Sequence, residues 1–72
     1  MTKRPFDDLN NAVGKQVLVK LKDNKSIRGT LKAFDVHLNL VLEEAEEIKA
    51  DEVKAKYSKI MLRGDNIILI SI

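Results

Sequence analysis

Two short polar segments contain the side chains of this 72-residue chain that are best suited to chemistry. The first is residues 35–39 (DVHLN), in which polar and apolar residues alternate, and the second is residues 63–66 (RGDN). An imidazole ring and a guanidinium plane can stack on a nucleotide base, and an Asn amide offers a base edge both a donor and an acceptor. The two segments indicate a binding site for single-stranded nucleic acid, with these candidate residues: Asp35, His37, Asn39, Arg63, Gly64 and Asp65.

The spacing within each segment predicts its shape. Because alternate residues of an extended segment share a face, we expect the three polar side chains of residues 35–39 to point the same way. Residues 63–66 are expected to form a tight turn in which Gly64 adopts positive φ. Asp65 is placed to accept a hydrogen bond from Arg63, Asn39 or a backbone N–H. A plainer interpretation is that the first segment only caps turns and the second is an ordinary hairpin.

The sequence offers little for catalysis. Its only histidine is His37, no serine lies in a Gly-x-Ser-x-Gly elbow, and the three glycines are too far apart for a phosphate loop. The chain has no cysteine, which excludes disulfides and thiol nucleophiles. We expect no enzymatic activity, no cofactor and no metal site. The enzymatic alternative is a metal-dependent nuclease that uses Asp35, His37 and Asp65, although their spacing matches no metal motif.

The composition is typical of a small folded domain over residues 1–72, with 44% hydrophobic and 33% charged residues. No apolar run approaches the roughly 18 residues needed to cross a bilayer. The N-terminus MTKRPFDDL lacks the apolar stretch of a secretory signal. We therefore expect a cytoplasmic location and no membrane contact. Because a core of this size is marginal, we also expect partner subunits to stabilise the fold.

A short helix is predicted over about residues 5–12. Pro5 suits the first helical position, and two aspartates follow in the first turn, where the helix dipole favours negative charge. Gly14 is a natural stop. The helix is expected to dock on the rest of the chain through an apolar stripe formed by Phe6, Leu9 and Val13.

Beyond the helix the hydrophobic period changes from about 3.6 to 2, which predicts five strands over about residues 16–72. A polar turn at residues 22–25 separates the first two strands. Gly29 in the second strand indicates a sharp bend of the kind that a small barrel needs. One face of the second strand is expected to carry Ile27, Gly29, Leu31 and Ala33.

A third strand is predicted from Leu38 into the acidic residues that follow. Residues 45–56 would also tolerate a helix, but we favour strand, with residues 49–56 as a polar loop or splayed hairpin end. Strand character returns at residues 57–62. The final residues 67–72 are almost continuously apolar, as in a strand buried on both faces. We expect this edge strand to pair with a neighbouring subunit, since an exposed apolar edge favours aggregation.

Both polar segments, with the strands around them, resemble the two signature motifs of the Sm-like (Lsm) family, in their archaeal form. The first motif matches residues 14–47, with Gly29 in the bent strand and the core FDVHLN. The second matches residues 60–72, IMLRGDNIILISI. The resemblance covers nearly the whole chain.

The resemblance implies a fold and a function. The family fold is mainly β: a short N-terminal helix on a five-stranded, strongly bent antiparallel SH3-like barrel. Its subunits form a homo-oligomeric ring, usually of seven in archaeal members, in which the fourth strand of one subunit pairs with the fifth of the next. The family binds uridine-rich single-stranded RNA at the inner pore rim and acts as an RNA chaperone or ribonucleoprotein scaffold. The alternative is a protein-interaction module on an SH3-like barrel without an RNA role.

The resemblance also implies a role for each candidate residue. His37 and Arg63 would stack on the base, and Asn39 would hydrogen-bond uracil. Asp65 would support Asn39 and the loop, Gly64 would leave room for the base, and Asp35 would orient the segment.

Two further expectations concern the surface outside the pore. Residues 1–34 carry eight basic and three acidic groups, whereas residues 35–72 carry five basic and eight acidic groups. Phe34 would stack a base if exposed, but we favour its packing under the helix. Basic residues of the first half would guide RNA on the helix face: Lys3, Arg4, Lys22, Lys25 and Arg28.

Overall fold

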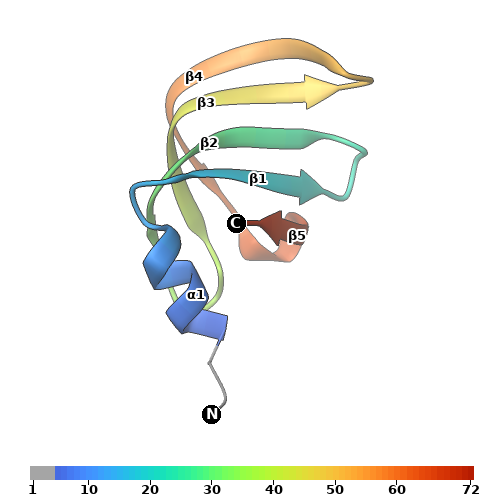
Figure 1. Ribbon diagram of the computed structural model, residues 1–72. Helices are drawn as coiled ribbons and strands as arrows, with labels where there is room; N and C mark the ends of the chain where they lie inside the picture. Colours follow the sequence, from blue (N-terminus) through green and yellow to red (C-terminus); the bar gives the residue numbers. More distant parts are fainter. Residues whose placement is uncertain (1–4) are drawn as a thin grey trace.

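The computed structural model describes the backbone of residues 5–72 and the side chains from Asp7 onward. The expectations for Lys3, Arg4 and the Phe6 side chain lie outside these described parts. The chain forms one helix and five strands (Figure 1): α1 (Pro5–Ala12), β1 (Gln16–Leu21), β2 (Ser26–Phe34), β3 (Leu40–Lys49), β4 (Glu52–Leu62), a single turn of 3-10 helix, η1 (Gly64–Asn66), and β5 (Ile67–Ser71).

The five strands form one antiparallel sheet in the order β4-β3-β2-β1-β5. The long strands curve together, and β5 lies below its hydrogen-bonded neighbour β1, with α1 to its left in the view of Figure 1. The predicted helix and the strongly bent antiparallel sheet are confirmed. Within one chain the barrel stays open, because β4 and β5 form the two edges of the sheet.

The core lies on the concave side of the sheet, where α1 covers one end. Among the helix side chains that the structure describes, from Asp7 to Ala12, Leu9 and Ala12 are buried. Val13, which we expected in the apolar stripe, is exposed because the helix ends one residue earlier and the chain turns away. The strands contribute these buried side chains: Val17, Val19, Ile27, Leu31, Leu40, Leu42 and Ala45.

The predicted bend at Gly29 coincides with a close approach of β3. A Cβ atom at Gly29 would lie 3.1 Å from the Cβ of Ala45 and from the carbonyl oxygen of Glu43. Opposite, the register of β2 and β3 shifts by one residue, and Glu44 takes a positive φ of 50°. The missing side chain and this bulge let the two strands bend sharply together.

The predicted face of β2 is wrong at Ala33, because a second register shift occurs between Leu31 and Ala33. Lys32 is the extra residue, so Ala33 turns outward and is exposed, whereas Leu31 remains buried. A one-residue bulge reverses the side-chain alternation that follows it. Phe34 then points inward again and packs against the core.

The hairpin of β3 and β4 differs from the prediction. Leu38 precedes the strand with a φ of 61°, and β3 begins at Leu40. Residues 49–56 are not a polar loop, because β4 begins at Glu52 and only Ala50 and Asp51 form the turn. The helical alternative for residues 45–56 is wrong as well. Polar residues extend this hairpin because opposite charges face each other across the strands.

Strand β5 is not buried on both faces. It is hydrogen-bonded to β1 alone, and Ile68, Leu69 and Ile72 expose 57%, 48% and 59% of their surface. Such an apolar edge is a ready template for a further strand. Within residues 5–72, none of the helical structure is long and apolar enough to span a membrane.

Candidate functional site

The first polar segment is a turn held together by one carboxylate. Asp35 Oδ1 accepts hydrogen bonds from the backbone N–H groups of His37 at 2.9 Å and Asn39 at 3.1 Å. Asp35 Oδ2 accepts a third from Asn39 Nδ2 at 3.0 Å. The N–H of Leu38 donates to the Asp35 carbonyl at 3.0 Å and closes the turn. The expected extended segment is therefore wrong, since the local Asp bonds favour a turn.

The carboxyl group of Asp35 is correspondingly stabilised as an anion. The hydrogen bond from the Asn39 side chain, followed by those from the Asn39 and His37 backbones, holds its pKa below the ordinary value of 3.8. A carboxylate that accepts several N–H bonds favours its charged form. Asp35 is therefore a fixed structural acceptor for this loop.

The second polar segment adopts the η1 turn, in which the N–H of Asn66 donates to the Arg63 carbonyl at 3.1 Å. Arg63 Nη2 lies 3.1 Å from Asp65 Oδ2, in an exposed ion pair. Of the three partners considered for Asp65, the structure selects Arg63. This contact aligns the guanidinium plane with the loop, although an exposed pair contributes little to stability.

Gly64 is needed for a reason other than the one predicted. Its φ is not positive; among the described glycines, only Gly14 has a positive φ, of 89°. A Cβ atom at Gly64 would overlap the backbone carbonyl oxygen of His37 and lie 3.1 Å from the Leu38 carbonyl. The absent side chain lets the backbones of the two loops touch.

One side chain joins the two loops. Asn39 Oδ1 accepts a hydrogen bond from the backbone N–H of Gly64 at 2.9 Å, while Asn39 Nδ2 donates to Asp35. Asp35 and Gly64, rather than Asp65, therefore orient Asn39. Because an acceptor faces one amide atom and a donor the other, the oxygen and nitrogen cannot exchange places. An Asn amide has two N–H donors and two oxygen lone pairs, so a second N–H on Asn39 Nδ2 and a second lone pair on Asn39 Oδ1 remain for a ligand.

All six predicted site residues lie in these two contacting loops. His37, Arg63 and Asp65 are exposed, whereas Asn39 and Gly64 are half-buried. The arrangement presents two planar side chains beside an amide of fixed orientation, which suits a flat heterocycle with polar edges. The bond between Asn39 and Gly64 was missed, because the two residues are 25 positions apart and no local pattern marks a side chain that pairs with a distant backbone group.

The loops do not suit metal-dependent hydrolysis. Across the described part of the chain, no three His, Asp or Glu side chains gather closely enough to hold a metal ion. The Asp35 carboxylate already accepts three N–H bonds, and Asp65 pairs with Arg63. The side chains that these loops present suit recognition by stacking and hydrogen bonding.

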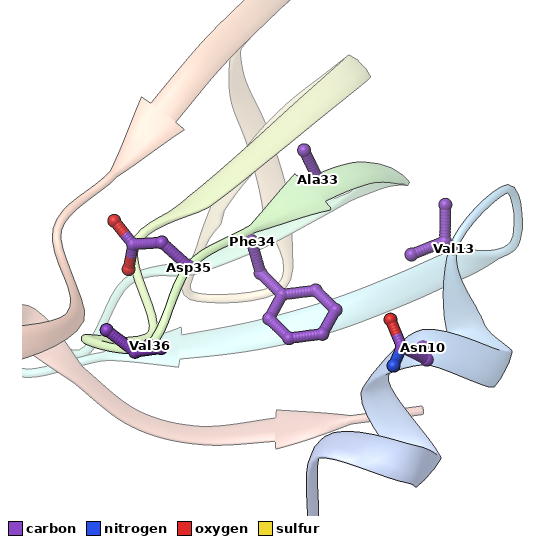
Figure 2. Close-up of a pocket in the computed structure, with 6 residues that line it drawn as sticks. All are labelled: Asn10, Val13, Ala33, Phe34, Asp35 and Val36. Atoms are coloured by element: carbon purple, nitrogen blue, oxygen red, sulfur yellow. The ribbon is translucent and has the colours of Figure 1, made fainter.

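An open pocket lies next to the first loop, between the end of β2 and α1. Figure 2 shows the Phe34 ring directed toward Asn10 of α1, with Val13 and Val36 on either side. Phe34 is half-buried and packs against the core, as we expected. Of the cations expected on the helix face, the three that the structure describes lie elsewhere. Lys22 and Lys25 flank the β1–β2 turn at the far end of that hairpin from α1 (Figure 1), and Arg28 is in β2.

Comparison with known proteins gives consistent results. The family model described as LSM domain matches residues 7–72. A protein of Methanosarcina acetivorans described as snRNP Sm-like is 48% identical over 71 residues, which cover 99% of both chains. The solved structure of a Pyrococcus abyssii Sm protein in complex with a uridine heptamer has a TM-score of 0.93 and 46% identity, covering 96% of this chain and 97% of that one. A heptameric archaeal Sm protein has a TM-score of 0.84 and 49% identity, covering 90% and 94%.

Proposed function

The chain belongs to the LSM domain family, and we propose that it forms a ring of seven subunits that binds uridine-rich single-stranded RNA at the inner rim of the pore. The observation that carries this proposal is the fixed amide of Asn39, held between Asp35 and Gly64 in the two loops that also carry the exposed His37 imidazole and Arg63 guanidinium. Solved relatives include an Sm protein bound to a uridine heptamer and a heptameric Sm protein.

The fixed amide explains a preference for uracil. Uracil presents an N3–H donor beside carbonyl acceptors, whereas cytosine presents an acceptor at N3 beside an amino donor. The remaining lone pair of Asn39 Oδ1 accepts from the uracil N3–H, and the remaining N–H of Nδ2 donates to a uracil carbonyl. An amide free to rotate would serve both bases. The bonds to Asp35 and Gly64 stop that rotation.

Stacking supplies the base-independent part of the binding. His37 and Arg63 stack on the base, and each stacked base contributes about 1–3 kcal/mol. Asp65 holds the Arg63 guanidinium in place, Asp35 orients the first loop, and Gly64 lets the two loops close. A single pocket of this kind binds weakly. A ring repeats the pocket, so successive uridines bind at high effective concentration.

Assembly follows from the two edges of the sheet. Strands β4 and β5 carry unpaired backbone edges, β5 exposes Ile68 and Leu69, and Ile72 directly after it is exposed as well. Pairing of β4 in one subunit with β5 in the next covers these side chains and continues the sheet around a ring. The 72 residues act as one domain, in the cytoplasm, as a non-enzymatic RNA chaperone or ribonucleoprotein scaffold.

The test is binding of the assembled protein to oligouridylate and oligocytidylate, measured by fluorescence anisotropy. We expect a clear preference for oligouridylate that Asn39→Ala removes. The matched control is Asn11→Ala, which removes an exposed amide from α1. Equal affinity of the unmodified protein for both homopolymers contradicts the proposal. In that case, retention of a protein partner after nuclease treatment would favour an interaction module.

A further inference from the structure

A charged network crosses the outer face of the sheet, on the side opposite the core. The two carboxylates of this network belong to the central strand β3, and each is shared by one cation from β2 and one from β4. Glu46 lies 2.7 Å from Arg28 and 3.9 Å from Lys56. Glu43 lies 3.8 Å from Lys32 and 4.0 Å from Lys59. We call these residues the cationic face: Arg28, Lys32, Glu43, Glu46, Lys56 and Lys59.

The bulge in β3 creates this pairing. Residues 43 and 46 are three apart and would point to opposite faces in a regular strand. The extra residue Glu44, with its φ of 50°, restores both glutamates to the outer face while Leu42 and Ala45 stay buried. The cross-strand register then places Glu43 opposite Lys59 and Glu46 opposite Lys56.

Within the ion pairs of the cationic face four cations share two carboxylates. The exposed Glu44 at the bulge lines the same surface hollow as Glu46 and Lys56, so three carboxylates face four cations and the cationic face keeps an excess of positive charge. The β4 lysines are the most available, since Lys56 and Lys59 expose 77% and 66% of their side chains and lie at the limit of ion-pair distance. The pKa of Glu46 is lowered, chiefly by its hydrogen bond with Arg28, so this carboxylate stays charged and paired. Exposed lysines held this loosely can exchange partners at little cost.

The cationic face also begins next to the base-binding loops. Lys59 precedes Arg63 by four residues, about 13 Å along an extended strand, and Lys56 lies three residues further along β4. Ring formation uses the backbone edges of β4 and β5, whereas these side chains stand away from the sheet plane. Strand pairing at these edges therefore does not by itself cover the side chains of the cationic face.

We propose that the cationic face binds the phosphate backbone of RNA that continues beyond the uridines held at the pore. This inference rests on the proposed function, because the base-binding loops must hold one part of the RNA before its remainder can reach the cationic face. The contact is independent of base identity, because lysine meets phosphate as a point charge. It extends the binding of long RNA, and salt weakens it through counterion release.

The experiment compares two RNAs on the assembled protein: a short oligouridylate, and the same oligouridylate with a long oligoadenylate tail. At low salt we expect the tail to strengthen binding about tenfold, and the gain to shrink as salt rises. The triple variant Lys32→Gln, Lys56→Gln, Lys59→Gln should reduce this gain below about twofold while leaving the affinity for the short RNA unchanged. Native mass spectrometry checks that the variant still assembles.

Two further variants complete the design. Lys54→Gln removes the same charge from β4, but from a lysine that pairs with Glu52, so the gain from the tail should persist. Glu43→Gln with Glu46→Gln frees the cations and should increase the gain. A tail that adds no affinity, or an equal gain in the triple variant, overturns the inference and leaves the face for an acidic protein partner. If the unmodified protein shows no preference for the short oligouridylate over oligocytidylate, the result would instead contradict the proposed function.

Discussion

The backbone N–H of Gly64 donates a hydrogen bond of 2.9 Å to the side-chain oxygen of Asn39 and so joins two loops that are 25 residues apart in the sequence. The same amide donates to Asp35 through its nitrogen. Each loop therefore fixes one atom of the Asn39 side-chain amide. We propose that base selectivity depends on this arrangement more than on any property of either loop alone.

The substitution Asn39→Asp tests the two hydrogen bonds of this side chain separately, because it keeps one and removes the other. The new carboxylate still accepts from Gly64, but it has no N–H for Asp35 and places two negative charges close together. We expect the affinity for oligouridylate to fall at least about tenfold, since a charged group without its partner is costly. Titration with oligouridylate and oligocytidylate measures the change. Unchanged selectivity would show that the orientation of the amide does not determine the choice of base.

Gly64→Ala tests the close approach of the loops. Its Cβ atom overlaps the His37 carbonyl, so the loops must separate, and we expect a loss of about 2–3 kcal/mol in the free energy of unfolding. The control Gly14→Ala introduces a positive-φ alanine in open space, which costs about 1–2 kcal/mol through backbone conformation alone. Chemical denaturation at fixed protein concentration measures both changes. Only Gly64→Ala should weaken oligouridylate binding, and equal binding by the two variants would argue against loop contact.

The carboxyl of Asp35 should titrate below its ordinary pKa of 3.8, because it accepts N–H bonds from Asn39 and His37. A lowered pKa in the folded state means that the stabilisation is present above the unfolded value and lost as the pH falls through the folded value. Carbon NMR of the Asp35 carboxyl measures the midpoint. Asn39→Ala should move that midpoint upward, since it removes the largest cause of the shift. A midpoint at or above 3.8 in the unmodified protein would be inconsistent with the observed bonds.

The turn between β3 and β4 can be improved. Ala50 and Asp51 both adopt positive φ, of 53° and 63°, which is costly for residues with side chains. Two-residue hairpins with this backbone favour Asn-Gly, so Ala50→Asn with Asp51→Gly should raise the free energy of unfolding by about 1 kcal/mol. Asn24→Gly is the control, because Asn24 already tolerates its φ of 60° in the other hairpin. Thermal unfolding that shows no gain in the double variant would disprove the assignment of the turn.

Much of the fold was predictable from local pattern. Pro5 and Gly14 bracket the helix, and Gly29 marks the bend of β2. Errors arose where a one-residue bulge changed the alternation, as at Lys32, or where β3 and β4 extend with polar side chains on both faces up to the turn at Ala50. A periodicity argument cannot detect either feature, because it assumes an unbroken strand with one apolar face.

The residues of the site could be predicted from the sequence, but the contacts between them could not. Two polar segments with the right residue types were visible in the sequence. The bond between Asn39 and the Gly64 backbone and the overlap between Gly64 and His37 depend on how the sheet brings residues together. The cationic face also depends on how the sheet brings residues together, because the acidic strand β3 lies between the two strands that supply the cations.

Native mass spectrometry of the 72-residue protein, with and without a short oligouridylate, tests the central claim most directly. It reports the number of subunits and the number of bound RNA chains in one measurement. We expect a seven-subunit assembly that binds oligouridylate and that binds oligocytidylate much more weakly. A monomer at micromolar concentration, or equal occupancy by the two RNAs, would contradict the account.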